Sequence, residues 1–384
     1  MTLGQSMVFG AGLTQMETGN WVMICIALFL GYLAIVKKFE PLLLLPLAFG
    51  MLIANIPAAG LGAYDDGRLL YYLYQGIIRI IYPPLVFMCI GAMTDFGPLI
   101  ARPINAFIGI GGQLGIFVAF GLSVLLSNFF APYIPGFEPF TLKEAASIAI
   151  IGSSDGPTSI FTSTRLAPEL LPSVAIAAFS YMALVPFIQP PIMRALTTPK
   201  ERVIVMKEPR QVSRRAKIIF PVALTIITLL LVPTAGVLVG MLMLGNVIKE
   251  SGVAIRYVRT LTNEALNILT LLIALSIGAS ATADRFLTPK TLIILFCGFV
   301  AFIFGTIGAV LIAKLLCKLT GGAINPLIGN AGVSAMPMAA RISQKLGQEY
   351  NPHNHLLMHA MGPIVASTIG SAIIAGLFIG YLGI

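Results

Sequence analysis

Charged residues are scarce in this sequence of 384 residues: Asp, Glu, Lys and Arg together make up 10% of it. A soluble globular domain usually carries about 25%. Hydrophobic residues make up 57% and gather in long runs, which indicates a protein that lies in a lipid bilayer. The bilayer core offers the backbone no hydrogen-bond partners, so such runs are expected to span as helices. The sequence therefore predicts an all-α polytopic membrane protein.

Cysteine is also scarce. The four cysteines are far apart and show no Cys-X-X-Cys spacing, which argues against a disulfide framework and against a cysteine-based zinc site. The net charge of +9 does not indicate nucleic-acid binding. The basic residues gather in loops between apolar runs, as the positive-inside rule predicts for cytoplasmic loops.

About ten apolar runs predict transmembrane helices, near 21–36, 41–58, 69–94, 103–127, 173–193, 217–232, 234–248, 265–283, 290–314 and 355–383. The longest polar loop is basic and is expected in the cytoplasm. Counting outward from this loop places eighteen Lys and Arg residues inside and five outside. Two further apolar segments are interrupted by Gly, Asn, Asp or Pro. On the same count, segment 143–165 is a re-entrant hairpin from the outside and segment 322–343 is one from the cytoplasm.

This arrangement predicts two inverted repeats, 1–194 and 217–384, joined by a basic cytoplasmic linker, 195–216. Each repeat would contain five spans and one hairpin. Short sequence matches support the duplication: Ile151-Gly152 recurs as Ile328-Gly329, and Gly50-Met51-Leu52 recurs as Gly240-Met241-Leu242. In transporters built from inverted repeats, the broken helices meet near mid-membrane and hold the coupling ion.

The first interrupted segment contains a carboxylate, in the sequence Gly152-Ser153-Ser154-Asp155-Gly156-Pro157. A charge at bilayer depth costs roughly 2.5–3.5 kcal/mol on insertion scales, so such residues usually face a cavity or a pathway. Asp155, hydroxyls such as that of Ser153, and freed carbonyl groups together favour a hard cation. The alternative is a structural role, because Asp-Gly-Pro is also a good helix start.

The second interrupted segment offers neutral oxygens from Asn325, Asn330 and Ser334. These groups either complete an ion site with Asp155 or form hydrogen bonds between packed helices. Tyr181 either anchors its span at the bilayer edge or faces the site, where its phenol could ligate a cation or donate a proton. Arg341 either follows the positive-inside rule or binds a carboxylate.

Two motifs and one residue between them suggest a family. GSSDGPTSIFTSTRLAPELL (152–171), Tyr181 and NPLIGNAGVSAMPMAAR (325–341) resemble the β subunits of the bacterial sodium-pumping, biotin-dependent decarboxylases. That family acts on oxaloacetate, methylmalonyl-CoA, glutaconyl-CoA or malonate. The chain is shorter at its N-terminus than the oxaloacetate members, which favours the acyl-CoA members.

The resemblance implies decarboxylation of carboxybiotin, which a partner subunit carries, coupled to Na⁺ export with consumption of a proton. The Na⁺ ligands would come from Asp155, Asn325, Ser334, Ser153, Asn330 and Tyr181. Tyr181, Arg341 and Asp155 would be catalytic, and the carboxybiotin would contact Arg341, Asn325, Gly329 and Ser334.

Partners implied by the resemblance are a carboxyltransferase α subunit, a biotin carrier protein or domain, and a small membrane-anchor γ or δ subunit. A homo-oligomer in the bacterial cytoplasmic membrane is also expected. The alternatives are a secondary transporter, exchanging Na⁺ for H⁺ or an organic anion without chemistry of its own, and a membrane scaffold that holds a peripheral enzyme.

Overall fold

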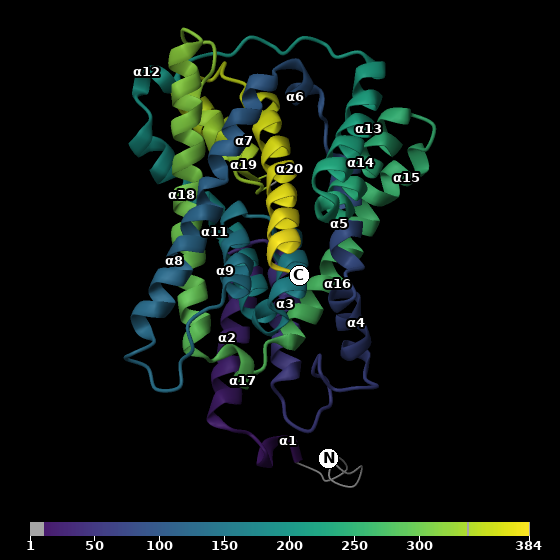
Figure 1. Ribbon diagram of the computed structural model, residues 1–384, viewed down its shortest axis with the longest axis vertical. Coiled ribbons are helices and arrows are strands. Elements are labelled where there is room, and N and C mark those ends of the chain that lie inside the picture. Colours follow the sequence, from purple (N-terminus) through teal and green to yellow (C-terminus); the bar gives the residue numbers. More distant parts are fainter. Residues whose placement is uncertain (1–10, 336–337, 384) are drawn as a thin grey trace.

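The computed structural model describes residues 11–335 and 338–383, which form helices and no β-strand (Figure 1). The longer helices are α2 (Thr18–Ile35), α3 (Pro41–Ala54), α4 (Leu69–Ile78), α5 (Tyr82–Met93), α7 (Ala106–Gly112), α8 (Leu114–Phe130), α9 (Leu142–Ala149), α10 (Gly156–Leu166), α11 (Leu171–Leu196), α13 (Arg214–Leu231), α14 (Gly236–Ser251), α15 (Ile255–Thr260), α16 (Leu266–Ser280), α18 (Pro289–Leu319), α19 (Met338–Tyr350) and α20 (Leu357–Leu382). Short helices are α1 (Ala11–Thr14), α6 (Gly97–Ala101), α12 (Pro199–Arg202) and α17 (Ala283–Phe286).

Five helical stretches in the described part of the chain are long and apolar enough to cross a membrane: Thr18–Ile35, Pro103–Phe130, Ile255–Ser280, Pro289–Leu319 and Leu357–Leu382. The count rises to seven if each of two bent helix pairs is one span. The all-α membrane architecture is therefore confirmed, but the predicted ten spans are not. Helix α3 has 14 residues and α14 has 16, fewer than the roughly 20 that usually span a bilayer.

One bent pair is α4 and α5, whose axes differ by 68°. Pro83 and Pro84 lie in the first turn of α5, where proline is tolerated because its missing N–H would have no partner within the helix. Ile80, between the two helices, has a left-handed backbone with φ of 58°. The second bent pair lies within and just before α11, which contains Pro186, Pro190 and Pro191; interior prolines remove a backbone hydrogen bond and bend a helix.

Helices from the two halves of the sequence pack in pairs, α3 on α16 and α5 on α14. Glycines permit this contact. A Cβ atom on Gly278 would lie 2.1 Å from the Leu47 carbonyl oxygen, and one on Gly245 would lie 1.9 Å from that of Met88. At these positions the backbones touch directly, and no side chain fits between them.

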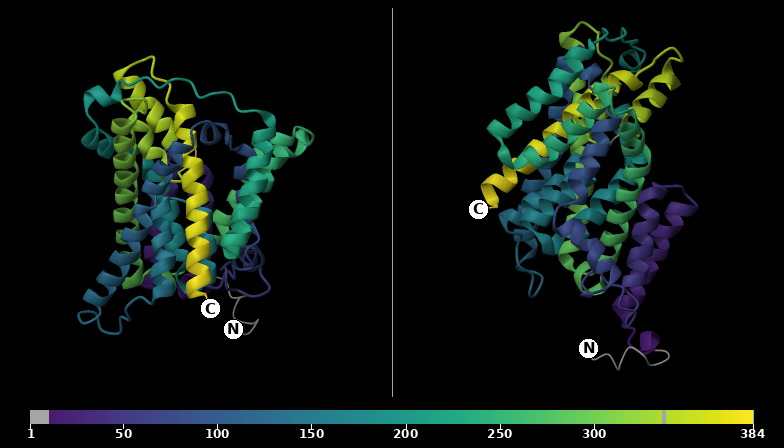
Figure 2. Two further views of the ribbon diagram at one scale, coloured as in Figure 1. Left: turned by 45° about the horizontal axis from the view of Figure 1, so that its top comes forward. Right: turned by 90° about the vertical axis from the view of Figure 1, so that its right-hand side faces the viewer.

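A polar segment joins the halves at one end of the molecule. It leaves α12, runs across that end and enters α13 (Figure 2). Arg202 holds its start, because its buried guanidinium donates to Thr197 Oγ1 at 2.9 Å and to the hydroxyl of Tyr350 at 2.6 Å. The first part of the linker is thus fixed to α19.

We expect Gly245→Ala to destabilise the protein, because the added methyl would overlap the Met88 carbonyl, and overpacking typically costs about 1–3 kcal/mol. Gly240→Ala is the matched control in the same helix, since nothing lies within 4 Å of a Cβ there. Thermal unfolding in detergent should show a lower midpoint for the first variant and an unchanged or higher midpoint for the second. Equal midpoints would contradict the direct backbone contact.

Candidate functional site

The first interrupted segment begins with a well-anchored helix. Thr141 and Glu144 form a capping box at the start of α9. The Lys290 ammonium of α18 donates to Glu144 Oε1 at 2.6 Å. The chain then forms a short 3₁₀ helix, Ile150–Ser153, and turns at Ser154, whose φ is 58°. The predicted break is therefore present at the expected residues.

Asp155 follows this turn and is buried. It is the N-cap of α10: its Oδ1 accepts a hydrogen bond from the Thr158 backbone N–H at 3.2 Å. Its Oδ2 accepts one from the hydroxyl of Ser371 in α20 at 3.0 Å. A carboxylate has about four acceptor positions, so these two bonds leave room for a further ligand. Capping and ligand binding can therefore coexist at this residue.

The second interrupted segment consists of a 3₁₀ helix, Pro326–Gly332, a short connection and α19, which continues past the expected end at residue 343 to Tyr350. Ser334, in the connection, contacts the first segment directly, because its backbone N–H donates to the Ser153 carbonyl at 2.9 Å. Its hydroxyl donates to Ser367 Oγ of α20 at 3.1 Å. The two breaks therefore meet, as the sequence predicts.

Gln113 is the single residue between α7 and α8, keeps right-handed helical backbone angles and is also buried. Its Nε2 donates to the carbonyl and the hydroxyl of Ser367, at 3.2 and 3.1 Å. Ser367 and Ser371 are one turn apart on α20, so they connect Gln113 and Ser334 to Asp155. We refer to these residues together as the oxygen cluster: Gln113, Ser153, Asp155, Ser334, Ser367 and Ser371.

Direct backbone contacts hold the cluster together. A Cβ on Gly112 would lie 1.7 Å from the Gly332 carbonyl oxygen, and a Cβ on Gly115 would lie 2.8 Å from that of Gly152. The junction between α7 and α8 therefore touches both interrupted segments within four residues of chain. Both contacts require glycine, because any side chain would occupy the space of a carbonyl group.

The oxygen cluster contains one carboxylate and no positively charged side chain. In the part of the chain that the structure describes, no Lys, Arg or His forms an ion pair with Asp155. Three buried oxygens among these residues and their neighbours, Gln113 Oε1, Ser154 Oγ and Thr158 Oγ1, have no hydrogen-bond partner. Leaving one buried polar group unpaired costs about 1–3 kcal/mol. An unpaired carboxylate surrounded by neutral oxygens is what a hard monovalent or divalent cation requires.

Transition-metal binding has no comparable support. Among residues 11–335 and 338–383, no group of three or more His, Cys, Asp or Glu side chains is close enough to hold a metal ion. The cluster contains one carboxylate and otherwise neutral oxygens, so it suits a cation of low charge.

Asn325 is placed differently from the prediction. Its Nδ2 donates to the carbonyls of Arg202 and Ile204, at 3.1 and 2.8 Å. Its Oδ1 accepts from the Leu327 N–H at 2.9 Å. The structure thus joins Asn325 to the linker and not to Asp155, because the side chain caps the 3₁₀ helix at the far end of the segment.

Asn330 and Gly329 also have structural partners. Asn330 Nδ2 donates to Gln189 Oε1 at 3.0 Å and to the Ala339 carbonyl at 2.8 Å, and its Oδ1 accepts from Ser343. Gly329 is buried against α18, where a Cβ would lie 2.5 Å from Val310 Cα. Neither residue faces the oxygen cluster or an open surface here, so the alternative of bonding between packed elements describes them better.

Tyr181 lies beside the first segment but points elsewhere. A Cβ on Gly298 of α18 would meet both the Tyr181 ring, at 2.6 Å, and the Ile151 side chain, at 3.0 Å. The phenol donates to the Leu295 carbonyl of α18. The structure therefore brings the ring next to Ile151 without joining the hydroxyl to Asp155.

Arg341 lies on the exposed face of α19, away from the buried cluster. It lines a surface hollow of about 450 Å³, whose other lining residues are Gln344, Lys345, Gln348, Glu349 and Leu357. No carboxylate in the described residues forms an ion pair with it. Burial raises the pKa of Glu40, and the positive charge of Arg341 offsets part of that rise. The predicted single site is thus two places: a buried oxygen cluster and an exposed cationic hollow.

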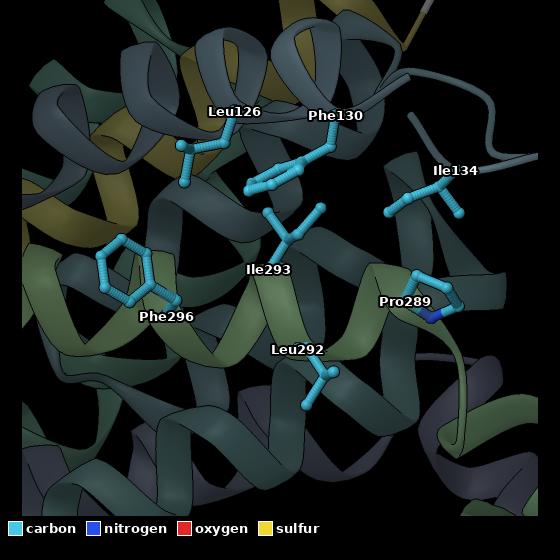
Figure 3. A pocket seen from close by; sticks show the side chains of 7 residues that line it. All are labelled: Leu126, Phe130, Ile134, Pro289, Leu292, Ile293 and Phe296. Carbon is cyan, nitrogen blue, oxygen red and sulfur yellow. The ribbon is translucent and has the colours of Figure 1, made fainter. Parts of the chain in front are cut away.

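A different hollow, of about 460 Å³, lies between α8 and α18. Figure 3 shows its apolar lining of Leu126, Phe130, Ile134, Pro289, Leu292, Ile293 and Phe296. It contains no titratable group and shares no residue with the oxygen cluster. An all-apolar surface of this kind in a membrane helix pair is ordinary lipid-facing surface.

Comparison with known proteins identifies the family. The model of the Na⁺-transporting oxaloacetate decarboxylase beta subunit matches residues 19–382. The chain belongs to this family. It is 50% identical to the methylmalonyl-CoA decarboxylase subunit beta of Propionigenium modestum, with 97% of each chain covered. It is 48% identical to the glutaconyl-CoA decarboxylase subunit beta of Acidaminococcus fermentans, covering 98% of this chain and 97% of the relative.

A third relative, the oxaloacetate decarboxylase beta chain 2 of Salmonella typhi, is 46% identical with 97% of each chain covered. The family resemblance seen in the sequence motifs is thereby confirmed. The relatives' names give three different substrates, so family membership does not by itself identify the substrate.

The position of Asn325 generates a test of its role. We expect Asn325→Ala to lose about 1–3 kcal/mol of stability, since buried linker carbonyls lose a donor. The Na⁺ dependence of decarboxylation in the assembled enzyme should not change. Asn354→Ala is the matched control, because Asn354 donates to the same Arg202 carbonyl at 3.0 Å. A higher Na⁺ requirement in the Asn325 variant alone would show that Asn325 is a ligand.

Proposed function

We propose that this chain is the membrane subunit of a Na⁺-translocating decarboxylase, which decarboxylates carboxybiotin and couples this step to Na⁺ export. Membership of the family supports the reaction class. The observation that carries the ion-binding part is the buried carboxylate of Asp155, which lies among neutral oxygens without a basic partner in the described residues. A transported cation supplies the missing charge.

The proposed Na⁺ site is centred on Asp155, with Ser334 and Ser153 as its neighbours from the two breaks. The Ser334 hydroxyl donates its hydrogen to Ser367, which leaves its oxygen lone pairs available to a cation. The Ser153 carbonyl accepts one hydrogen bond and keeps a second lone pair. Asn325, Asn330 and Tyr181 are assigned supporting roles outside the ion's direct contacts, since each makes the hydrogen bonds described above.

Arg341 is the proposed contact for the carboxyl group of carboxybiotin. Its guanidinium is exposed, has no carboxylate partner within ion-pair distance in the described residues, and matches a carboxylate in shape and charge. Decarboxylation breaks the bond between the ureido nitrogen and the carboxyl carbon, releases CO₂ and leaves the electron pair on nitrogen. That nitrogen then takes a proton, so a general acid is needed. Tyr181 stays our candidate for the group that passes this proton on.

The same proposal includes partners, because biotin is not attached to this chain. The relatives' names as beta subunits or chains indicate multi-subunit complexes. We propose a carboxyltransferase α subunit, a biotin carrier and a small γ or δ membrane anchor as partners, together with self-association in the bacterial cytoplasmic membrane. Substrate choice would then rest with the carboxyltransferase.

We also propose that residues 1–194 and 217–384 are inverted repeats; residues 1–10, 336–337 and 384 lie outside those described. Reciprocal contacts support this. Asn55 of the first half donates to the Ala281 carbonyl at 2.8 Å, and Asn246 of the second donates to the Thr94 carbonyl at 2.9 Å. The counterpart of Gly50 is Gly245, because these two glycines touch the matching positions of α16 and α5. Gly240, which the sequence match suggested, touches nothing.

Replacing the acid tests the ion site. We expect Asp155→Asn to lower Na⁺-stimulated decarboxylation by about a hundredfold or more, since the ligand charge is lost. Carboxyl transfer from substrate to biotin, measured separately in the same complex, should stay intact. Asp284→Asn, at an exposed aspartate, is the matched control. A membrane scaffold predicts instead that the Asp155 variant still supports CO₂ release at the normal rate, and a transporter without chemistry predicts no CO₂ release from carboxybiotin by the unaltered subunit.

Replacing the arginine tests the carboxybiotin contact. Arg341→Gln should lower the rate of CO₂ release about tenfold or more, because a charge-assisted bidentate contact is lost. The Na⁺ concentration that gives half the maximal rate should stay the same. Lys345→Gln removes a positive charge from the same hollow and serves as control. If both variants lose equal activity, the hollow contributes only general positive charge.

A further inference from the structure

We propose that Gln113 is a ligand of the transported cation, supplying its side-chain oxygen from the junction between α7 and α8. This inference deepens the proposed function and rests on it, since it presumes a cation bound near Asp155. The sequence motifs of both interrupted segments leave this residue out. Gln113 lies in a third segment of the chain, and that segment contacts both interrupted segments.

The first argument is position. Gly112, immediately before Gln113, is pressed against Gly332, and Gly115, two residues after it, is pressed against Gly152. Gln113 therefore lies between the backbone contacts to the second and first interrupted segments. Its side chain is 5% exposed, so it points into the protein and not into lipid.

The second argument concerns the two ends of the carboxamide. The Nε2 group is fully used: it donates to the Gly109 carbonyl at 3.1 Å and to both oxygens of Ser367. These three acceptors also fix which end of the amide is nitrogen. The Oε1 atom on the other side is buried and lacks a hydrogen-bond partner. Four buried amide oxygens in the described residues lack a hydrogen-bond partner, those of Asn105, Gln113, Asn246 and Asn354. Of these, only the oxygen of Gln113 belongs to the oxygen cluster, where a bound cation would satisfy it.

The third argument is the link to the proposed ligands. Gln113 Nε2 and Ser334 Oγ both contact Ser367 Oγ at 3.1 Å. One turn further along α20, Ser371 donates to Asp155. Gln113 is thus fixed relative to both serines of α20 that contact the proposed ion ligands. A carboxamide oxygen is a neutral donor of the kind that hard cations accept alongside a single carboxylate.

A purely structural role for Gln113 predicts a different result from a ligand role. In a structural role only the Nε2 hydrogen bonds matter, because they hold α7 against α20. In a ligand role the oxygen matters for Na⁺ affinity. The variants Gln113→Met and Gln113→Glu separate the two, since both lose the Nε2 donors and only the second keeps an oxygen at the same position.

Both variants are measured in the assembled decarboxylase, with Na⁺ as the probe. We expect Gln113→Met to raise the Na⁺ concentration for half-maximal decarboxylation about tenfold or more. We expect added Na⁺ to raise the unfolding temperature of the wild type and this variant to lose that rise. Gln113→Glu should retain the Na⁺-dependent stabilisation, because its carboxylate oxygen can still bind the cation.

Asn246→Leu is the matched control for the cost of burying an altered amide. Asn246 is also fully buried, and its Oδ1 is also without a partner, but it lies between α14 and α5, outside the oxygen cluster. This variant should lose stability without changing the Na⁺ concentration for half-maximal activity. A common effect of all amide losses on Na⁺ affinity would overturn the inference.

The failure modes are distinct. If Gln113→Met folds and keeps the wild-type Na⁺ dependence while Asp155→Asn loses it, Gln113 is not a ligand and the proposed function stands. If Gln113→Glu loses the Na⁺ response as fully as Gln113→Met, Gln113 acts only through Ser367. If neither Asp155→Asn nor Gln113→Met alters the Na⁺ dependence, the proposed ion site itself is wrong.

Discussion

Backbone contact without intervening side chains is the constraint on which the oxygen cluster depends. Gly112 against Gly332 and Gly115 against Gly152 bring the two interrupted segments and the α7–α8 junction to one place. Breaks free backbone N–H and C=O groups, which a protein interior tolerates only when partners are supplied. The bond from Ser334 N–H to the Ser153 carbonyl pairs one freed group from each segment. The polar side chains can lie this close together because the backbones that carry them are in direct contact.

The two charged residues of the proposed mechanism have opposite charges and lie in different parts of the protein. Asp155 is a buried negative charge without a basic partner, and Arg341 is an exposed positive charge without an acidic one within ion-pair distance, among the described residues. The second interrupted segment physically connects their surroundings, because Ser334 in the cluster and Arg341 in the hollow are only seven residues apart in the sequence. In the proposed mechanism, the carboxylate contact Arg341 and the ion neighbour Ser334 therefore belong to the same segment.

The sequence alone predicts the helical class, both interruptions and the meeting of the two interrupted segments. These features follow from composition and from local Gly, Pro and Asp patterns. It does not predict that Asn325 and Asn330 bond elsewhere, since that depends on the linker and on α11. Nor does it reveal Gln113, Ser367 and Ser371, although each is a polar residue in an apolar run. The hydrogen bond between Gln113 and Ser367 joins residues 254 positions apart in the sequence, and the one between Ser371 and Asp155 joins residues 216 positions apart. Only the folded structure shows these contacts.

The linker has a mechanical consequence. Its first part is fixed by Arg202, by the buried side chain of Met206 and by the Lys207 carbonyl, which accepts from Arg102 at 2.8 Å. Beyond these anchors, residues 208–213 form no helix before α13 begins. Six residues extend to roughly 20–22 Å at most. Residues 208–213 therefore set an upper limit on the distance between α13 and the part of the protein that contains α19, as long as the contacts of Arg202, Met206 and Lys207 are kept.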